Sequence, residues 1–249
     1  INGIASTNLL GIPLLVYILA AVVAAGWVLL NRTTFGRRTV AVGYEHVAEA
    51  AAEGRGVILA LPHLGAWEWA AFWLSAVRGH EITAVAEQIE PPELAEWFVG
   101  LRAALGIEVV PFGPDAAVAC VRALKAGRVL ALPSDRDLAG TGVPVTFFGE
   151  ETTLPGGPAT LALRTGAPLL TVACYFDLDG GHLGVALERI DTERRGRLRD
   201  DVARVTQALA DDLEELIRRA PEQWHLLQPN WPSDHEALAH PGTSRPAAT

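Results

Sequence analysis

His63 follows an apolar run, Val57 to Leu61, with Pro62 between them, and Glu68 lies five residues further along. A histidine has an ordinary pKa of about 6.5 and can accept a proton from a hydroxyl group at neutral pH. A carboxylate beside the ring would orient it and stabilise its protonated form. We predict that His63 is a general base oriented by Glu68. The alternative is that His63 is a hydrogen-bonded core histidine and that Glu68 only complements the start of a helix.

The spacing of His63 and Glu68 constrains the local structure. Within one helix, a five-residue step turns the chain by about 500 degrees, which leaves the two side chains roughly 140 degrees apart. The two can meet only if His63 precedes the helix that carries Glu68. Pro62 and Gly65 interrupt the chain at this point. The sequence therefore predicts a strand, then a loop with His63, then a helix that begins near Glu68.

Strands and helices are predicted to alternate along the rest of the chain. The predicted strands cover 38–42, 57–61, 82–86, 108–110, 129–132, 169–175 and 183–187, the predicted helices cover 45–53, 68–77, 93–105, 116–126, 158–165 and 200–219, and a long loop covers 133–155. This alternation predicts an α/β fold with a mostly parallel central sheet and helices on both faces. Ligands bind such folds outside the carboxyl ends of the strands, where we expect both His63 and Asp135.

Composition excludes several classes of function. The chain has 249 residues and a net charge of -9, which argues against a nucleic-acid partner. Cys120 and Cys174 are far apart in the sequence and show neither a disulfide framework nor metal-ligand spacing. The histidines show no paired metal-binding spacing either. We expect no metal and no bound cofactor.

The N-terminal segment is unusually apolar. Residues 1–31 carry no charge, and the run from Leu9 to Leu30 would form about 33 Å of helix, enough to span the hydrocarbon core of a bilayer. Arginines follow this run at positions 32, 37 and 38, which predicts that the rest of the chain lies at the cytoplasmic face of the membrane. The alternative is a buried or interfacial helix, because Gly11 and Pro13 interrupt its start. At the other end, a tail over 235–249 is predicted to be disordered.

Six short motifs occur in a fixed order along residues 38–234. They are LPHLGAWE (61–68), DRDL (135–138), VTFFGE (145–150), LPGGPA (154–159), RTGAP (164–168) and WHLLQP (224–229). On these motifs the chain resembles phosphatidylinositol mannoside acyltransferases, relatives of the lipid A lauroyl and myristoyl acyltransferases in the wider glycerolipid acyltransferase superfamily. The superfamily signature has aspartate where this chain has Glu68.

The resemblance implies an acyltransferase domain over 32–234. It implies transfer of a long-chain acyl group from acyl-CoA, as co-substrate, to a sugar hydroxyl of a membrane glycolipid, a phosphatidylinositol mannoside. The chain has no G-x-S-x-G elbow, which disfavours a hydrolase that works through a serine nucleophile. Two alternatives stay open: the same chemistry on a lysophospholipid or a lipid A precursor, and a membrane-tethered lipid-binding protein with a degenerate site.

The resemblance also assigns side chains to the acceptor. It implies that Asp135 and Asp137 contact sugar hydroxyls, for which carboxylates are strong acceptors. It places Arg102 near the catalytic groove, where the guanidinium would pair with a phosphate or with Glu68, and Arg164 would likewise meet a phosphate. The alternatives are a solvated turn for the aspartates, an exposed helical position for Arg102, and for Arg164 an interaction with the last turn of its own helix.

Aromatic residues and a glycine pair are the candidates for the acyl-CoA. The acyl chain is expected to contact Trp67, Trp69, Trp73, Phe147 and Phe148, and a phosphate of CoA is expected at the helix start formed by Gly156 and Gly157. The alternatives are ordinary core packing for the aromatic rings and an unexceptional helix start for the glycines.

Overall fold

The computed structural model describes residues 8–9, 12–13, 39–87, 91–177, 181–226 and 228–239. Near the N-terminus, β1 (Asn8–Leu9) pairs with β2 (Ile12–Pro13), so the helix predicted from Leu9 does not begin there. The rest of that predicted helix lies outside the described residues. In the ranges given above, no helix is both long and apolar enough to cross a bilayer.

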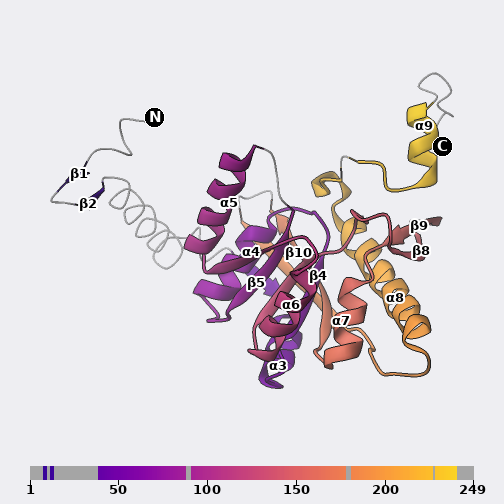
Figure 1. The fold of residues 1–249 in the computed structure, drawn as a ribbon, viewed down its shortest axis with the longest axis horizontal. Helices are drawn as coiled ribbons and strands as arrows, with labels where there is room; N and C mark the ends of the chain where they lie inside the picture. The colour runs from indigo at the N-terminus through magenta and orange to yellow at the C-terminus, as the bar shows by residue number, and fades with distance from the viewer. Residues whose placement is uncertain are drawn as a thin grey trace.

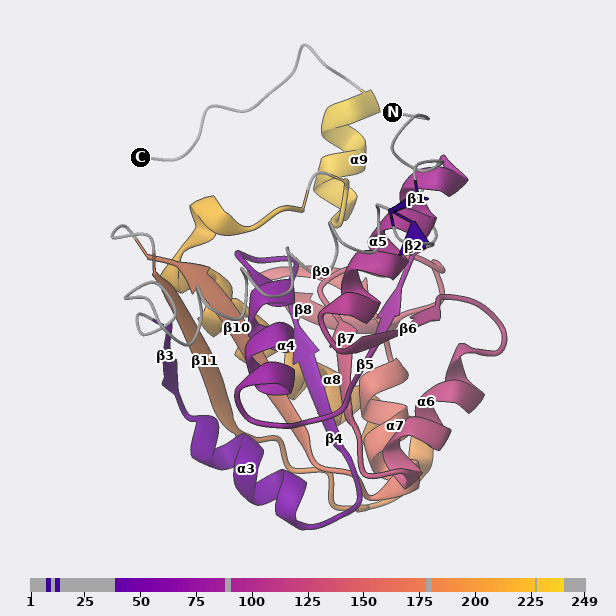
Figure 2. The ribbon, with the colours of Figure 1, turned by 90° about the vertical axis from the view of Figure 1, so that its left-hand side faces the viewer.

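In the described part of the chain, seven strands form the central sheet, in the order β3-β11-β10-β4-β7-β5-β6. Figure 2 shows this order from β3 on the left to β6 on the right. The strands are β3 (Thr39–Val42), β4 (Val57–Leu61), β5 (Ile82–Ala86), β6 (Ile107–Pro111), β7 (Val129–Pro133), β10 (Leu169–Phe176) and β11 (His182–Arg189). Every pair of neighbours is parallel except β10 with β11. The mostly parallel sheet predicted from the sequence is confirmed.

Helices cover both faces of the sheet, as predicted (Figure 1). The first group is α3 (Tyr44–Ala52), α4 (Trp67–Ala76) and α5 (Pro92–Ala104), and the second is α6 (Ala116–Lys125), α7 (Gly157–Thr165) and α8 (Leu198–Arg219). Two apolar clusters, one on each face, form the core. All five residues of β4 are buried, because a central parallel strand is covered on both sides. Its apolar side chains thus fix the strand that carries the chain to His63.

The predicted loop over 133–155 contains a β-hairpin. Its strands are β8 (Val143–Phe147) and β9 (Glu150–Leu154), and the hairpin packs on α8. The turn places Phe148 at a φ of 54° and Gly149 at 82°. A positive φ is strained for phenylalanine, so other contacts must hold this turn in place.

The C-terminal tail is also more ordered than predicted. A short 3₁₀ turn, η2 (Pro221–Gln223), follows α8, and α9 spans Pro232–Ala239. Residues 235–239, the start of the tail predicted to be disordered, therefore lie in a helix. The carboxylate of Asp234 helps to start this helix by accepting the backbone N–H groups of Asn230 and Trp231.

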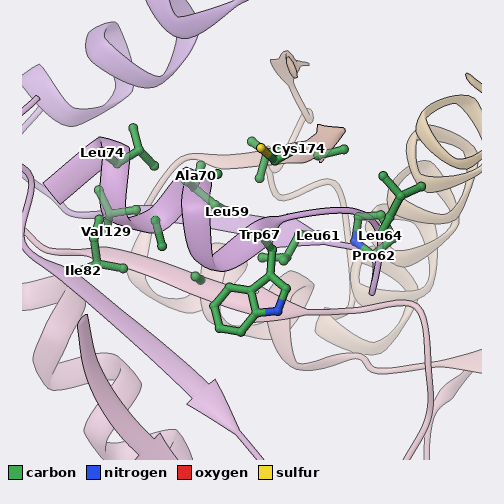
Figure 3. Close-up of a pocket in the computed structure, with 14 residues that line it drawn as sticks. Leu59, Leu61, Pro62, Leu64, Trp67, Ala70, Leu74, Ile82, Val129 and Cys174 are labelled. Atoms are coloured by element: carbon green, nitrogen blue, oxygen red, sulfur yellow. The ribbon is translucent and has the colours of Figure 1, made fainter. Parts of the chain in front are cut away.

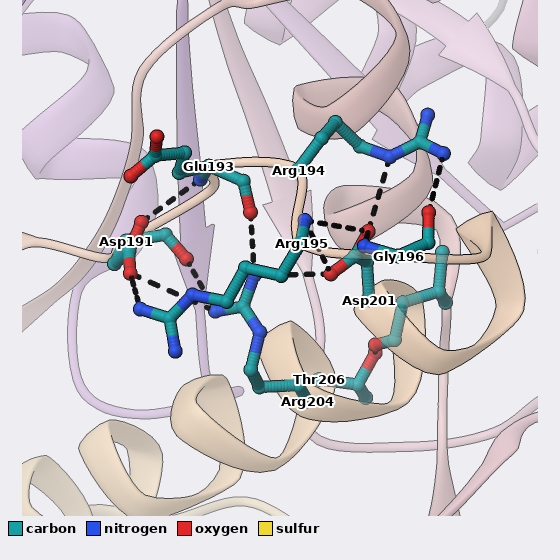
Figure 4. A network of polar contacts seen from close by, with 9 residues as sticks. Asp191, Glu193, Arg194, Arg195, Gly196, Asp201, Arg204 and Thr206 are labelled. Carbon is teal, nitrogen blue, oxygen red and sulfur yellow. Dashed lines mark hydrogen bonds and ion pairs between the residues drawn. The ribbon is translucent and has the colours of Figure 1, made fainter.

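A polar network fixes the start of α8 (Figure 4). The buried carboxylate of Asp201 accepts the backbone N–H groups of Arg195 and Gly196 and a side-chain bond from Arg194. These are the donors of the turn that leads into the helix, and a carboxylate in the first helical turn satisfies them. The network anchors the connection between β11 and α8, the helix that covers much of the second face.

One acidic group weakens the fold at neutral pH. Asp212, on α8, accepts a hydrogen bond from the buried Thr171 of β10, at 2.8 Å. Burial, with a contribution from the nearby Glu215 and Asp211, raises the pKa of Asp212 to about 6. Because the folded protein binds this proton more tightly than the unfolded chain, stability falls as pH rises from about 4 to about 6.

We expect Asp212→Asn to stabilise the protein by about 1 kcal/mol at pH 8, an effect reduced because the side chain partly faces solvent. The gain should shrink below pH about 6 and vanish near pH about 4, where the aspartate itself is neutral in both states. Urea unfolding at several pH values measures this. The control is Asp211→Asn, which removes a charge from an exposed neighbour. A gain of equal size at every pH would contradict the prediction.

Candidate functional site

His63 lies in the loop between β4 and α4, as its neighbours predicted. Here the segment after η2 pairs with the loop. Leu64 forms a bridge with Trp224, and the backbone N–H of His225 donates to the carbonyl oxygen of His63, at 2.7 Å. On the other side, the N–H of Ala66 donates to the carbonyl of Cys174, at 2.8 Å. The loop is thus held by backbone bonds from two distant segments.

Gly65 is required at the centre of this loop. Its φ is +58°, and a Cβ at this position would lie 2.0 Å from the carbonyl oxygen of Cys174. We expect Gly65→Ala to destabilise the protein by roughly 2 to 4 kcal/mol, since strain at a positive φ is added to a backbone clash. Chemical denaturation measures it. The control is Gly54→Ala, which has a φ of +72° but open space around the new methyl group. Equal losses in both variants would show that the clash is unimportant.

Asp135 is the carboxylate that contacts the His63 ring. Its Oδ1 lies 2.6 Å from His63 Nδ1, and its Oδ2 accepts the backbone N–H of His63 at 2.9 Å. The same Oδ2 accepts the indole N–H of Trp224 at 2.7 Å. The Asp135 side chain is fully buried, whereas that of His63 is 35% exposed. The ring therefore directs Nδ1 at a buried anion and leaves Nε2 for a reacting group.

The strand order explains this contact between residues 72 positions apart. β4 and β7 are parallel neighbours, with Leu61 opposite Pro133. His63 and Asp135 each come two residues after these paired positions, so both reach the same carboxyl edge of the sheet. The sequence predicted that both residues lie at strand ends, but not that these strands are adjacent.

The pKa of each partner is shifted by the other. The hydrogen bond to Asp135 raises the pKa of His63 above its ordinary value, against the opposing effect of burial. Burial alone would raise the pKa of Asp135, but the bonds from His63 and Trp224 outweigh it and keep the pKa below its usual range. The pair therefore favours an ionised Asp135 that supports a proton on His63.

Glu68 does not take the orienting position predicted for it. It lies in the first turn of α4, and its carboxylate accepts a bond from Arg102 of α5, at 3.0 Å. The Arg102 guanidinium also lies over the ring of Trp67, 5.0 Å from its centre. Of the two contacts expected for Arg102, the one with Glu68 is present. The pair joins α4 to α5 beside the loop that carries His63.

The sequence did not predict a second ion pair at this edge of the sheet. Arg136, directly after Asp135, donates to Glu87, which directly follows β5. Both charges act on His63: Arg136 lowers its pKa and Glu87 raises it. Both residues follow the end of a strand, and β5 and β7 are neighbours in the sheet. Their position at strand ends is the signal in the sequence that could have identified the pair.

An apolar cavity lies between α4 and the sheet, beginning at the His63 loop (Figure 3). It encloses about 30 Å³ and its walls include Pro62, Leu64, Trp67, Leu74 and Cys174. That is room for about two water molecules. Within α4 only Ala71 is buried, and the other side chains of this helix are at least partly exposed.

The other predicted acyl-site aromatics lie elsewhere. Trp69 stacks on His182 of β11, and Trp73 packs edge-on against Tyr44 of α3. Neither lines the cavity. Phe147 is fully buried and stacks on Trp231, while Phe148 stacks on Trp224. Both phenylalanines belong to the cluster on the opposite face of the sheet, so core packing describes them better.

Two further residues predicted to bind the acceptor have a different environment in the structure. Asp137 accepts the N–H groups of Ala139 and Gly142 and the hydroxyl of Thr153, and so it closes its own loop. Arg164 is exposed in the last turn of α7. That helix leads to the start of β10, at the sheet edge opposite His63, so the structure does not bring Arg164 to this site.

The glycines at the start of α7 lie across the sheet from Trp67, because α7 packs on the second face. Gly157 has open space around it, whereas a side chain at Gly156 would meet Val143. In the described residues, no group of three or more His, Cys, Asp and Glu side chains could hold a metal ion.

Comparison with known proteins decides the family. The model of the bacterial lipid A biosynthesis acyltransferase family matches residues 16–233. The chain belongs to this family. Among its relatives are phosphatidylinositol mannoside acyltransferases of Mycobacterium tuberculosis, strain CDC 1551 / Oshkosh, 43% identical over 196 residues, and of Mycolicibacterium smegmatis, 41% identical over 209 residues.

These alignments cover 77% and 82% of the chain. They cover 60% and 66% of the two relatives, so the chain spans somewhat under two thirds of their length. The region matched by the family model, 16–233, contains the His63 loop, the Asp135 segment and Trp224. These are the parts of the candidate site.

Proposed function

We propose that this chain transfers a long-chain acyl group from acyl-CoA to a sugar hydroxyl of a phosphatidylinositol mannoside, at the cytoplasmic face of the membrane. The observation that carries the proposal is the contact between His63 Nδ1 and the buried Asp135, at 2.6 Å, in a member of an acyltransferase family. The names of its relatives supply the acceptor class.

The reaction needs a base and no enzyme nucleophile. His63 Nε2 removes the proton of the acceptor hydroxyl while its oxygen attacks the thioester carbonyl, and Asp135 stabilises the imidazolium that forms. The C–S bond then breaks, and the imidazolium returns its proton to the departing CoA thiolate. Neither cysteine suits a nucleophile role: both are buried, and burial raises the pKa of Cys174 to about 12.

The acyl chain enters between α4 and the sheet. The cavity there is apolar and starts at Pro62 and Leu64, on either side of His63, so a chain in it would present its thioester to the base. Its present volume of about 30 Å³ requires α4 to move away from the sheet on binding. The contact of Arg102 with Trp67 and Glu68 lies at this end of α4.

Arg102 and Arg136 face the anionic part of the substrates. Their side chains are 15% and 13% exposed, and each is held by one glutamate. The Nε atoms of both are buried and have no hydrogen-bond partner among the residues that the structure describes, so the terminal NH₂ groups would be the ones to meet a ligand. The paired N–H groups of a guanidinium are suited to a lipid phosphate or a phosphate of CoA.

A competition of acceptors tests the proposal. Purified protein is incubated with a mixed pool of long-chain acyl-CoA thioesters and three acceptors: a phosphatidylinositol mannoside, lysophosphatidate and a lipid A precursor. Mass spectrometry of the lipids reports the acceptor and the length of the transferred chain together. We expect an acylated mannoside as the main product.

Each other outcome identifies an alternative. A main product from lysophosphatidate or from the lipid A precursor would keep the chemistry and overturn the acceptor. Lipid binding without any acylated product, under conditions where a relative is active, would support a degenerate lipid-binding protein instead.

A further inference from the structure

An indole N–H reaches the carboxylate that contacts His63. Trp224 Nε1 donates to Asp135 Oδ2 at 2.7 Å, the same oxygen that accepts the backbone N–H of His63. Because Asp135 is fully buried, no solvent can replace a lost donor without a rearrangement. The N–H of Trp224 therefore competes with the His63 ring for the negative charge of the carboxylate.

Three aromatic rings hold this indole in place. Phe148 stacks on it at 5.7 Å and 29°, and Phe147 and Trp231 meet it edge-on at 6.2 and 6.1 Å. Aromatic contacts in these geometries stabilise a pair beyond its buried area. The orientation of the Trp224 N–H is thus fixed by packing and not only by its hydrogen bond.

The ring of Phe148 is held against Trp224 by a strained turn. Phe148 is the non-glycine residue with a positive φ, 54°, in the described chain. Two groups of α8 secure it: Glu214 accepts its backbone N–H, and the Arg218 guanidinium lies 4.9 Å from its ring centre. Strain of this kind persists only where surrounding contacts impose it.

We propose that Trp224 is a positioning residue of this site, acting on His63 through Asp135, and that the Phe148 turn clamps its indole. The inference rests on the proposed function for its catalytic meaning, but its effect on His63 can be measured without any substrate. Removing the indole donor concentrates the charge of Asp135 on its bond with the imidazolium, which favours the protonated ring. The other charges that act on His63 are Arg136 and Glu87, which pair with each other.

The experiment compares two tryptophans of one cluster. Trp224→Phe removes the donor to Asp135, whereas Trp231→Phe removes an indole that donates to the carbonyl of Phe147, at 2.9 Å. Both variants lose one N–H and the same ring volume. The titration of His63 is followed by NMR of imidazole resonances, assigned with His63→Gln, and the pH dependence of kcat/KM is measured alongside.

We expect Trp224→Phe to raise the titration midpoint of His63 and the acidic limb of kcat/KM by roughly half to one pH unit, and to lower kcat about tenfold at neutral pH. KM for the acyl donor should change little. Trp231→Phe should lower stability but leave the His63 titration in place.

A second variant covers the case in which Trp224→Phe does not fold. Phe148→Leu keeps the indole but removes the ring stacked on it, and we expect a smaller shift of His63 in the same direction. An unchanged or lowered midpoint in the folded variants, or an equal shift in Trp231→Phe, overturns the inference. A shifted titration in a protein without acyltransferase activity would support the positioning role and refute the proposed function.

Discussion

Replacing His63 by glutamine should reduce acyl transfer about 10²- to 10⁴-fold while the protein stays folded. Glutamine can still donate to Asp135, so the buried carboxylate keeps a partner, but its amide cannot accept a proton from the acceptor hydroxyl. The loss should appear mainly in kcat, because the base acts in the transition state and not in substrate binding.

The measurement is the rate of acceptor-dependent CoA release, with circular dichroism to confirm the fold. His46→Gln, on the outer helix α3, is the matched control, and it should keep full activity. Turnover retained by purified His63→Gln would refute the general-base role. That result would be compatible with binding of acyl-CoA at this site, but another residue would have to act as the base.

The position of His63 was predictable because its signals are local. The apolar residues of β4 mark a buried strand, and Pro62 and Gly65 interrupt the chain at its end. Gly65 has the positive φ that such a turn requires. The exclusion of a shared helix face for His63 and Glu68 followed from helical geometry alone.

The partner of His63 was not predictable by the same means. Asp135 was a candidate for sugar binding, and the five-residue spacing favoured Glu68 as the orienting carboxylate. The deciding fact is the order β4-β7-β5, in which the later strand β7 inserts between β4 and β5. Strand order depends on packing over the whole sheet, and no periodicity in one sequence encodes it.

Of the aromatic residues packed beside Asp135, some lie in a segment with a local sequence pattern and one does not. The hairpin β8–β9 has buried Val145 and Phe147 at a two-residue step, so its first strand was readable inside the segment predicted as a loop. Trp224 had no such signal. It follows α8 in a segment without periodicity, and its contact with Asp135 depends on the chain returning beside the His63 loop.

In the structure Asp135, and not Glu68, contacts the ring of His63. The amide variants of these two residues should therefore differ strongly in activity. In Asp135→Asn, the two N–H groups that meet Oδ2 will select the amide oxygen for that place. The NH₂ group must then face His63 Nδ1, which becomes an acceptor, and the ring proton moves to Nε2. Since Nε2 can no longer accept the hydroxyl proton, we expect a loss of about 10³- to 10⁴-fold in kcat.

Glu68→Gln is the matched comparison, because it removes the charge of the other carboxylate near this loop and leaves an amide oxygen that can still accept from Arg102. Its side chain is 38% exposed, so we expect a loss of tenfold at most. The ¹⁵N shifts of His63 provide a second readout: Asp135→Asn should convert the neutral ring to the Nε2–H form, and Glu68→Gln should not. A greater loss of activity in Glu68→Gln than in Asp135→Asn would restore Glu68 as the residue that orients the base.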